Sequence, residues 1–389
     1  MSHPTYINVS IIEPVGGHGG MDYYDYGLCS ALSQAGAQIS LHTCDKTDLT
    51  SSNLFAVYRD YVDIYGKDPA WKRGLRFIRG TFLALFHARS LKAQICHFHF
   101  FKIGVLEALN SFLARLFGFK LVITIHDVEP FDHQSKLPIL SRLTYFLASG
   151  VIVHNIISKH ELLRVSNINQ DKISIIPHGN YLSYTGQLPD KRLAHKALNL
   201  PPDSTVLLFF GQIKEVKGLD ILLESLPRVI KNHKNTILLI AGRPWKTTFD
   251  EYEIKIKNLG IENHCFCHIR FIPDNEVPIF FGAADLVVLP YRRIYQSGVI
   301  LMSMSYEKPV IASDLPGMKE VITDNITGYL FRSGDCNSLA DRIIEVLSSI
   351  NSSKNVAREG KKLMERNYNW EMIGEKTVNF YRSILIKNG

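Results

Sequence analysis

Residues 285–302 of the chain read Asp-Leu-Val-Val-Leu-Pro-Tyr-Arg-Arg-Ile-Tyr-Gln-Ser-Gly-Val-Ile-Leu-Met. The opening apolar run stops at a proline, as a short buried strand does, and the pattern predicts a helix that begins near Ser297. A second buried-type strand, Pro-Val-Ile-Ala-Ser, follows at 309–313. A strand, a helix and another strand in succession predict parallel pairing in a sheet with helices on both faces.

The same alternation runs outward from this stretch in both directions. Further strands are predicted in two groups, at 6–13, 38–43, 95–100, 120–125, 151–154 and 173–177, and at 205–211, 236–242 and 268–272. Residues 181–204 are polar and contain prolines, which is typical of a linker. We therefore expect two Rossmann-like domains, 1–182 and 205–365, whose strands present their carboxyl ends to a shared ligand cleft.

The overall composition fits a two-domain globular protein of 389 residues. Apolar residues make up 46% and charged residues 21%, which argues against a disordered or fibrous chain. Six cysteines are scattered along the chain without a short repeating spacing, as expected in a reducing compartment. No basic-then-apolar leader opens the sequence, and its apolar runs stop short of the roughly 18 residues of a membrane span. These features predict a cytoplasmic protein.

Positive charge is concentrated between residues 70 and 121, where nine Lys or Arg accompany one acid, Glu107. Near the start of this segment, Lys72, Arg73, Arg76 and Arg79 alternate with large apolar residues. Such a segment can lie on anionic lipid at the inner face of a membrane, although an ordinary surface helix has the same pattern. Nucleic acid is a weaker candidate partner, because no nucleic-acid-binding motif accompanies the charge.

Two short segments of the second half could hold a diphosphate. In residues 209–218, Phe-Phe-Gly-Gln-Ile-Lys-Glu-Val-Lys-Gly, a strand leads through Lys214 and Lys217 into a helix. Ser297 can cap the other helix, and Gly298 leaves room for phosphate oxygens to approach backbone N–H groups. Each segment alone could be an ordinary surface turn, so the prediction depends on their occurring together.

Taken together, these segments resemble glycosyltransferase family 4, whose members are retaining enzymes with the two-domain GT-B fold. The resemblance is strongest over residues 205–345, which include Phe-Ile-Pro at 271–273, Gln-Ser-Gly-Val at 296–299 and the turn before Glu320. It implies that a nucleotide diphosphate sugar, linked to UDP or GDP, binds at a set of donor-site residues: Gly16, Gly17, Gly211, Ile272, Gln296, Ser297, Gly298, Val299 and Glu320. It also implies that residues 366–389 form a terminal helix that returns to the first domain.

The chain departs from the usual family pattern at two places. Most members carry paired glutamates at the positions of Ile294 and Met302, whereas a subset with Gln-Ser-Gly-Val lacks them, and this chain is similar to that subset. Gln212 stands where many members have a phosphate-binding arginine, so Lys214 and Lys217 are expected to supply the positive charge. What replaces the glutamates is left open.

In the first half, the resemblance rests on the Gly-Gly loop at 16–17, Ile-His-Asp at 125–127 and Pro-His-Gly at 177–179. Glycines let the backbone approach phosphate or sugar closely. His126 ends a predicted strand, and the family's histidine at this place contacts the sugar near the reacting carbon. Residue pattern alone is equally consistent with a buried structural histidine. His178 is predicted to be structural or to lie on the acceptor side.

The expected reaction is the transfer of a sugar to a hydroxyl of a glycan acceptor that is linked to lipid. Lys214, Lys217 and the helix beginning at Ser297 would stabilise the leaving diphosphate, and His126 would orient the sugar or assist proton loss. The sequence has no Asp-x-Asp motif, and neither a metal nor another cofactor is expected; His-Cys-Phe-Cys-His at 264–268 is predicted to be a packed strand. Two alternatives stay open, a nucleotide-sugar epimerase or hydrolase and a non-catalytic membrane-surface binding protein.

Overall fold

The computed structural model describes residues 6–17, 20–126, 128, 138–183, 185–246 and 248–386. These residues form two compact units. Unit 1 contains residues up to 179 together with the C-terminal segment from 368, and unit 2 contains residues 180–367. Asp127, His18 and Gly19, which belong to motifs noted in the sequence, lie outside the described residues.

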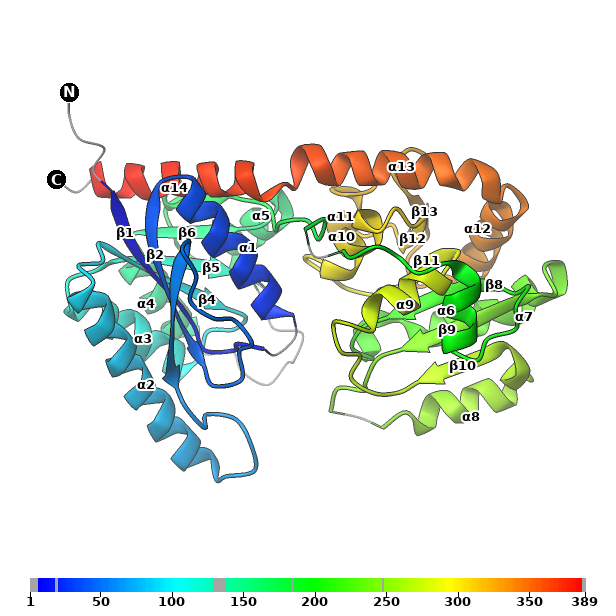
Figure 1. Ribbon diagram of the computed structural model, residues 1–389, viewed down its shortest axis with the longest axis horizontal. Coiled ribbons are helices and arrows are strands. Elements are labelled where there is room, and N and C mark those ends of the chain that lie inside the picture. The colour runs from blue at the N-terminus through cyan, green and yellow to red at the C-terminus, as the bar shows by residue number, and fades with distance from the viewer. Residues whose placement is uncertain are drawn as a thin grey trace. The chain divides into compact units, whose positions relative to one another are not determined.

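Unit 1 is built on a parallel sheet with strand order β3-β2-β1-β4-β5-β6-β7 (Figure 1). Its strands are β1 (Ile7–Glu13), β2 (Ala37–Cys44), β3 (Phe55–Tyr61), β4 (Ile95–Phe100), β5 (Lys120–Ile125), β6 (Gly150–Val153) and β7 (Ile173–Ile175). Its helices are α1 (Met21–Gln34), α2 (Ala70–Ser90), α3 (Val105–Leu116), α4 (Pro138–Leu147), α5 (Ile156–Val165) and α14 (Trp370–Ile386). The central strands are almost wholly buried because helices cover both faces, as their continuous apolar sequences predict.

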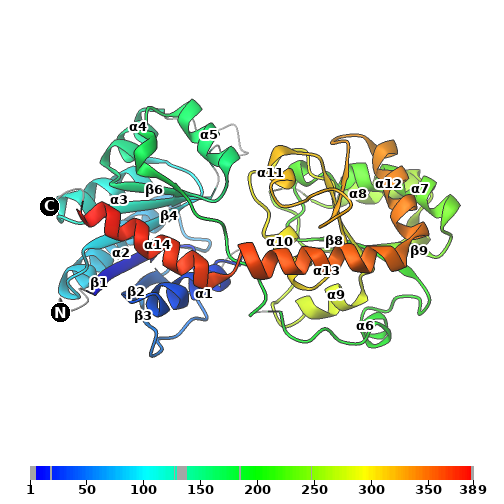
Figure 2. The ribbon, with the colours of Figure 1, turned by 90° about the horizontal axis from the view of Figure 1, so that it is seen from above.

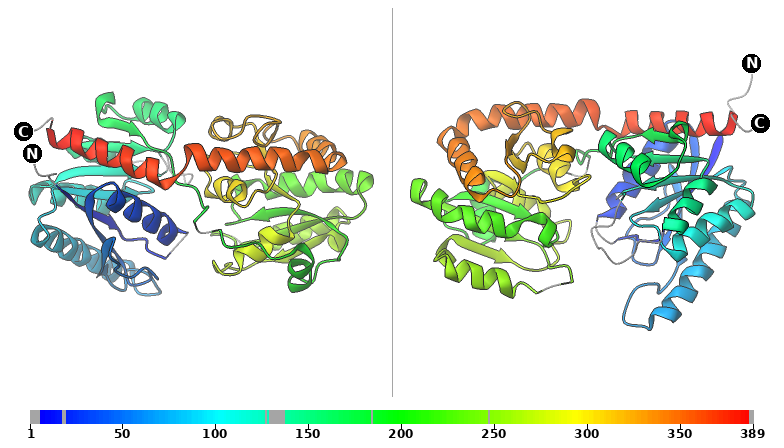
Figure 3. Two further views of the ribbon diagram at one scale, coloured as in Figure 1. Left: turned by 45° about the horizontal axis from the view of Figure 1, so that its top comes forward. Right: turned by 180° about the vertical axis from the view of Figure 1, so that it is seen from behind.

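The two faces of this sheet are covered by different helices. Helix α14 packs along α1 on one face, and their side chains join β1 and β2 in one core (Figure 2). On the other face, α3 packs against both α2 and α4, and these helices cover a second core that includes Phe98, Leu121 and Ile123 (Figure 3). The chain from residue 368 onward is thus part of unit 1.

Unit 2 repeats the same strand order, β10-β9-β8-β11-β12-β13, again with parallel pairing. Its strands are β8 (Thr205–Phe210), β9 (Thr236–Ala241), β10 (Cys265–His268), β11 (Leu286–Leu289), β12 (Val310–Ser313) and β13 (Tyr329–Phe331). Its helices are α6 (Lys191–Ala197), α7 (Leu219–Asn232), α8 (Asp250–Asn258), α9 (Val277–Ala283), α10 (Gly298–Ser305), α11 (Pro316–Lys319), α12 (Cys336–Ser348) and α13 (Ile350–Asn367).

The structure differs from the sequence prediction in three places. Two edge strands, β3 of unit 1 and β13 of unit 2, were not predicted. The strand predicted at 264–268 is β10 (Cys265–His268), whereas the strand predicted at 268–272 does not form, because Arg270 turns the chain back with its N–H on the His268 carbonyl. Residues 181–204, predicted as a linker, belong to unit 2 and contain α6, which packs on α9.

Candidate active site

The loops after β8 and β11 lie at the point where the strand order of unit 2 reverses. Strands β8 and β11 are neighbours, whereas their chain connections leave in opposite directions. In open parallel sheets, ligands bind outside the carboxyl ends of the strands at this point. The topology therefore predicts a ligand site at residues 211–218 and 290–299. The sequence predicts diphosphate binding in the same two segments.

Close backbone packing shapes the first of these loops. A Cβ atom on Gly242 would lie 1.8 Å from the carbonyl oxygen of Gly211, and a Cβ atom on Gly218 would lie 1.9 Å from that of Pro290. Gly218 also has a φ of 65°, in the left-handed region that favours glycine. Only glycine at positions 218 and 242 allows the loop after β8 to pack this closely against the backbone of the loops after β9 and β11.

Both predicted lysines of this loop lie beside aromatic rings. Lys217 Nζ is 3.8 Å from the ring centre of Tyr291, and Lys214 Nζ is 5.1 Å from that of Trp245. The backbone N–H of Arg292 donates to the Val216 carbonyl at 2.9 Å and joins the loops after β8 and β11. Cation–π contacts position the two ammonium groups without neutralising their charge, so the edge keeps its ability to attract an anion.

The second loop ends in the predicted helix start. Ser297 is the N-cap of α10, and its Oγ accepts from the Ile300 N–H at 3.4 Å. The same Oγ lies 3.5 Å from the Tyr291 hydroxyl, so one tyrosine contacts both Lys217 and Ser297. A Cβ atom on Gly211 would lie 3.4 Å from Val299 Cγ2. The structure thus brings Gly211, Lys217, Ser297 and Val299 together.

Gln296 and Gly298 flank this cap in different environments. The side-chain amide oxygen of Gln296 is buried and has no hydrogen-bond partner among the described residues. A Cβ atom on Gly298 would lie 2.7 Å from the Tyr181 hydroxyl, so this glycine accommodates a tyrosine of the same unit. A buried acceptor without a donor is unfavourable unless a ligand or water supplies one. Gln296 is therefore available to a ligand hydroxyl.

The other two donor-site candidates of this unit lie in the segments that follow β10 and β12. Ile272 is buried in the segment after β10. Glu320 is exposed at the C-terminal end of the short helix α11, and its N–H donates to the Pro316 carbonyl. Contact of either residue with a donor stays a prediction.

In unit 1, His126 follows β5 and lies among other aromatic side chains. Its ring stacks on Phe101 with centroids 4.5 Å apart and is 5.2 Å from the ring of Tyr24. Its Nδ1 is 3.3 Å from His154 Nε2, whereas its Nε2 is buried without a hydrogen-bond partner among the described residues. Nε2 of His126 is therefore the atom that can meet a ligand.

Histidines near the carboxyl ends of the neighbouring strands complete this cluster. Tyr24 of α1 has ring contacts with His99, His126, His154 and His178. Burial lowers the pKa of His154 to about 3 and that of His178 to about 4. Burial, followed by the charge of His154, holds the pKa of His126 well below its usual range. These imidazoles are neutral at physiological pH.

Sequence reasoning placed His126 at this edge and named His178 as structural or on the acceptor side, but it missed Tyr24, His99 and His154. His97 and His99 alternate along β4, so they point to the same face of the strand, and this spacing was the available signal. Tyr24 had no comparable signal, because its role depends on how α1 packs across the sheet. His178, whose Nδ1 lies 2.8 Å from the Gly179 carbonyl, belongs to the buried cluster.

The predicted glycine loop after β1 is held by a residue that the sequence did not single out, Glu13. Its carboxylate accepts from Val15 N–H at 2.9 Å and from Gly16 N–H at 2.8 Å. Burial raises the pKa of Glu13 to about 7, although both backbone hydrogen bonds oppose that shift. Cβ atoms on Gly16 and Gly17 would lie 2.5 Å from Cys44 Sγ and 2.2 Å from the Lys46 carbonyl oxygen. These glycines are thus required by packing, and their contact with a donor stays a prediction.

The four cations proposed for membrane contact all lie in the first half of α2. Lys72 and Arg79 are exposed. Arg76 forms an ion pair with Asp68 at 2.6 Å, and Arg73 donates to the Asp68 carbonyl at 3.0 Å. Lys72 and Arg79 therefore offer the more accessible charge.

Two family models match the chain, one for each half. The description "Glycosyltransferase Family 4" applies to residues 18–182, and "Glycosyl transferases group 1" applies to residues 190–363. A D-inositol 3-phosphate glycosyltransferase of Xylanimonas cellulosilytica is 23% identical over 94% of this chain and 92% of its own length. The capsular polysaccharide biosynthesis glycosyltransferase CapM of Staphylococcus aureus is 22% identical over 64% of this chain.

The chain spans less than two thirds of the length of several curated relatives that it matches, among them CapM at 65%. Among solved structures, Anabaena Alr3699/HepE in complex with UDP-glucose superposes with a TM-score of 0.75 at 18% identity. The superposition covers 97% of this chain and 100% of that chain. This likeness shows the fold, two Rossmann-like domains of the GT-B type.

Proposed function

Because the chain belongs to glycosyltransferase family 4, we propose that it transfers a sugar from a UDP- or GDP-linked donor to a hydroxyl of a glycan acceptor. The observation that carries this proposal is the convergence of Gly211, Lys217 and the Ser297 cap at the strand-order reversal of unit 2. Cations, closely approached backbone and a helix N-terminus together suit a diphosphate. The likeness to a structure that contains UDP-glucose also supports such a donor.

The proposed chemistry is electrostatic and retains the configuration of the anomeric carbon. When the bond between that carbon and the diphosphate oxygen breaks, negative charge grows on the diphosphate. Lys214, Lys217 and the first amides of α10 would stabilise this charge without a metal ion. Removing one such group typically lowers kcat by about 10²- to 10³-fold.

Two polar atoms that have no hydrogen-bond partner among the described residues are candidates for holding the sugar itself. The buried amide oxygen of Gln296 can accept from a sugar hydroxyl and would thereby take over part of the role of the missing glutamates. Neutral His126 can donate or accept at Nε2, so it would orient the sugar or receive the acceptor's proton. Both roles belong to the proposal.

The proposed acceptor is a lipid-linked glycan in the synthesis of a cell-surface polysaccharide or glycolipid. Relatives named for capsular polysaccharide, lipopolysaccharide and phosphatidyl-myo-inositol chemistry support this choice. The protein would then work in the cytoplasm at the inner face of the membrane, with Lys72, Arg73, Arg76 and Arg79 attracting anionic headgroups.

A thermal-shift screen tests the donor site directly. The chain would be heated with UDP-glucose, UDP-galactose, UDP-N-acetylglucosamine and GDP-mannose, and at least one should raise Tm. Lys217→Ala should abolish most of that rise. Lys231→Ala, which removes an exposed lysine from the last turn of α7, the helix that follows Lys217, should preserve it. If no nucleotide sugar stabilises the wild-type protein, the donor site is wrongly assigned.

Product analysis then separates the three candidate activities. A transferase consumes the donor only when a glycan acceptor is present, whereas an epimerase or hydrolase alters it without any acceptor. A non-catalytic binding protein leaves every nucleotide sugar intact under both conditions.

A further inference from the structure

Helices α2, α3 and α4 carry large apolar side chains that are exposed to solvent and do not pack into the core of unit 1. On α2, Trp71 is 64% exposed, and Leu75 and Phe86 are exposed along with it. The inner side of this helix buries a different set that includes Ala84 and Leu85. Helix α2 therefore has two apolar sides, of which only one faces the core.

The neighbouring helices repeat this arrangement. Leu116 of α3 and Phe146 of α4 are 67% and 79% exposed, and Phe112 and Ile139 are exposed as well. The ring of Phe86 contacts that of Phe117, just after α3, with centroids 5.3 Å apart, which links the apolar surfaces of α2 and α3. Since α3 packs against both α2 and α4, these side chains lie on adjacent helices (Figure 3). We name the exposed side of α2, α3 and α4 the outer helical face.

Cations surround the apolar residues of the outer helical face. The three helices contain seven Lys or Arg and one acid, Glu107. That acid is engaged locally, because its carboxylate accepts from the Gly104 N–H at 2.8 Å. Besides Lys72 and Arg79 of α2, Arg115 of α3 and Arg142 of α4 extend the positive charge across the face. Exposed apolar side chains accompanied by cations on adjacent helices are typical of a surface that meets anionic lipid.

We propose that the outer helical face docks on an anionic lipid bilayer, with its aromatic and aliphatic side chains entering the interface and its cations contacting lipid phosphates. Among the helices that the structure describes, none combines the length and apolarity needed to cross a bilayer, so the docking is lateral. The proposal deepens the proposed function by naming the surface that brings the protein to a lipid-linked acceptor. It extends the contact from the four cations of α2 to apolar residues on three helices.

Charge also argues against a second copy of the chain as the occupant of this surface. Two outer helical faces pressed together would oppose cations to cations, because the three helices contain seven Lys or Arg, of which Arg76 pairs with Asp68, and one acid. Like charges brought together without counter-charges are unfavourable, whereas lipid phosphates provide the opposite sign.

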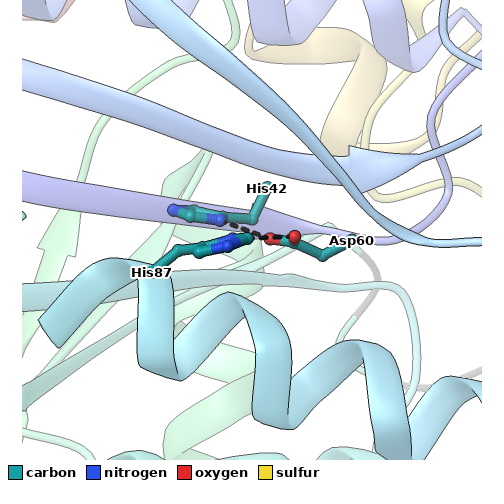
Figure 4. Close-up of side chains that lie close together, drawn as sticks. All are labelled: His42, Asp60 and His87. Atoms are coloured by element: carbon teal, nitrogen blue, oxygen red, sulfur yellow. Dashed lines mark hydrogen bonds and ion pairs between the residues drawn. The ribbon is translucent and has the colours of Figure 1, made fainter. Parts of the chain in front are cut away.

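A buried cluster fixes α2 to the sheet before any lipid binds. His42 of β2 and His87 of α2 approach different oxygens of Asp60 of β3, at 2.7 and 2.9 Å (Figure 4). The other ring nitrogen of His42 lies 3.1 Å from the hydroxyl of Ser40. Since the second half of α2 is held in this way, the outer helical face is preformed and need not fold on contact with the membrane.

Vesicle co-sedimentation of the full chain tests the proposal. The wild type should bind vesicles of equal parts phosphatidylglycerol and phosphatidylcholine and bind pure phosphatidylcholine much more weakly. A triple variant, Phe86→Ser with Leu116→Ser and Phe146→Ser, should lower partition into the mixed vesicles at least about tenfold, because three exposed apolar anchors are lost. The matched control is Leu193→Ser with Ile254→Ser, which removes exposed apolar residues from unit 2 and should leave partition unchanged.

Two further measurements make the outcome decisive. The nucleotide-sugar thermal shift of the triple variant should equal that of the wild type, so a failure of docking is distinguishable from a failure of the donor site. Unchanged vesicle binding of the triple variant would overturn the proposal. A wild type that sediments as a dimer, and a triple variant that sediments as a monomer, would also overturn it, because the face would then bind a second copy.

Discussion

The carboxyl edge of the sheet in unit 1 and the corresponding edge in unit 2 follow strands in the same order but carry different side chains. In unit 1, buried neutral histidines surround Tyr24. In unit 2, Lys214 and Lys217 lie over aromatic rings beside glycines that allow close backbone approach. One edge offers uncharged hydrogen-bonding groups, and the other offers positive charge and helix amides.

The two edges therefore suit different kinds of ligand group. A diphosphate carries charge and suits the cations and the helix start of unit 2. A sugar is neutral and suits imidazoles that donate or accept single hydrogen bonds. The shared strand order thus positions both edges, whereas the residues at the strand ends decide what each edge binds.

The most severe test of this assignment is Gly218→Ala in unit 2. The new Cβ would lie 1.9 Å from the Pro290 carbonyl oxygen, at a φ of 65° that alanine rarely adopts. We expect unit 2 to lose about 3 kcal/mol or more of unfolding free energy and to lose the nucleotide-sugar thermal shift. Urea denaturation measures the first effect. Gly186→Ala, where the added Cβ meets open space, should change neither property.

A pair of variants separates the two edges functionally. Lys217→Ala should weaken UDP binding and lower kcat/KM about 100-fold, because the diphosphate loses a cation. His126→Ala should lower kcat by a factor of about 10 to 100 and leave UDP affinity nearly unchanged, because the histidine is assigned to the sugar. Calorimetry with UDP and steady-state kinetics measure both. Equal loss of UDP affinity in the two variants would contradict the assignment.

The sequence predicted the edge of unit 2 more completely than that of unit 1. Lys217, Ser297 and their glycines belong to short local segments, so spacing along the chain already indicates their role. The linking ring of Tyr291 could not be assigned, since its contact with Lys217 depends on how two loops meet. In unit 1, Tyr24 acts through ring contacts that exist only after α1 packs on the sheet, whereas Glu13 bonds N–H groups two and three residues further along the chain. A residue whose role depends on contacts with distant parts of the chain cannot be recognised from the spacing of residues in a single sequence.

Acidification should destabilise unit 1 more than unit 2. A histidine whose folded pKa is lowered contributes stability that is complete above its unfolded pKa and is lost as the pH falls toward the folded value. For His154 and His178 the window runs from a pKa of 6.5 down to about 3 and about 4. Glu13, with a pKa raised to about 7, acts in the opposite direction and offsets part of the loss. The raised pKa of Asp25 acts like that of Glu13, whereas the lowered pKa values of His97, His99 and His126 add to the loss, so we expect a net fall in the unfolding free energy of unit 1 between about pH 7 and pH 5.

The measurement uses the positions of the tryptophans. In Trp245→Phe the remaining tryptophans, Trp71 and Trp370, belong to unit 1, so their fluorescence in urea titrations reports that unit. His178→Gln removes one titrating group and should flatten the pH dependence. Stability of unit 1 that is equal at both pH values would show that these histidines are not held neutral by burial.

The smallest effect is expected for Arg292 and Asp220, whose side chains lie 2.6 Å apart at the edge of unit 2. Both groups are partly exposed, so their ion pair should contribute only about 0.5 kcal/mol to unfolding free energy in a double-mutant cycle of Arg292→Ala and Asp220→Ala. The backbone bond from Arg292 N–H to the Val216 carbonyl persists in these variants and should hold the Lys217 loop in place. The affinity for UDP should therefore change by less than about threefold. A coupling energy of several kcal/mol would mean that the charges at this edge support the fold of unit 2 as well as its ligand, which would weaken the contrast with unit 1.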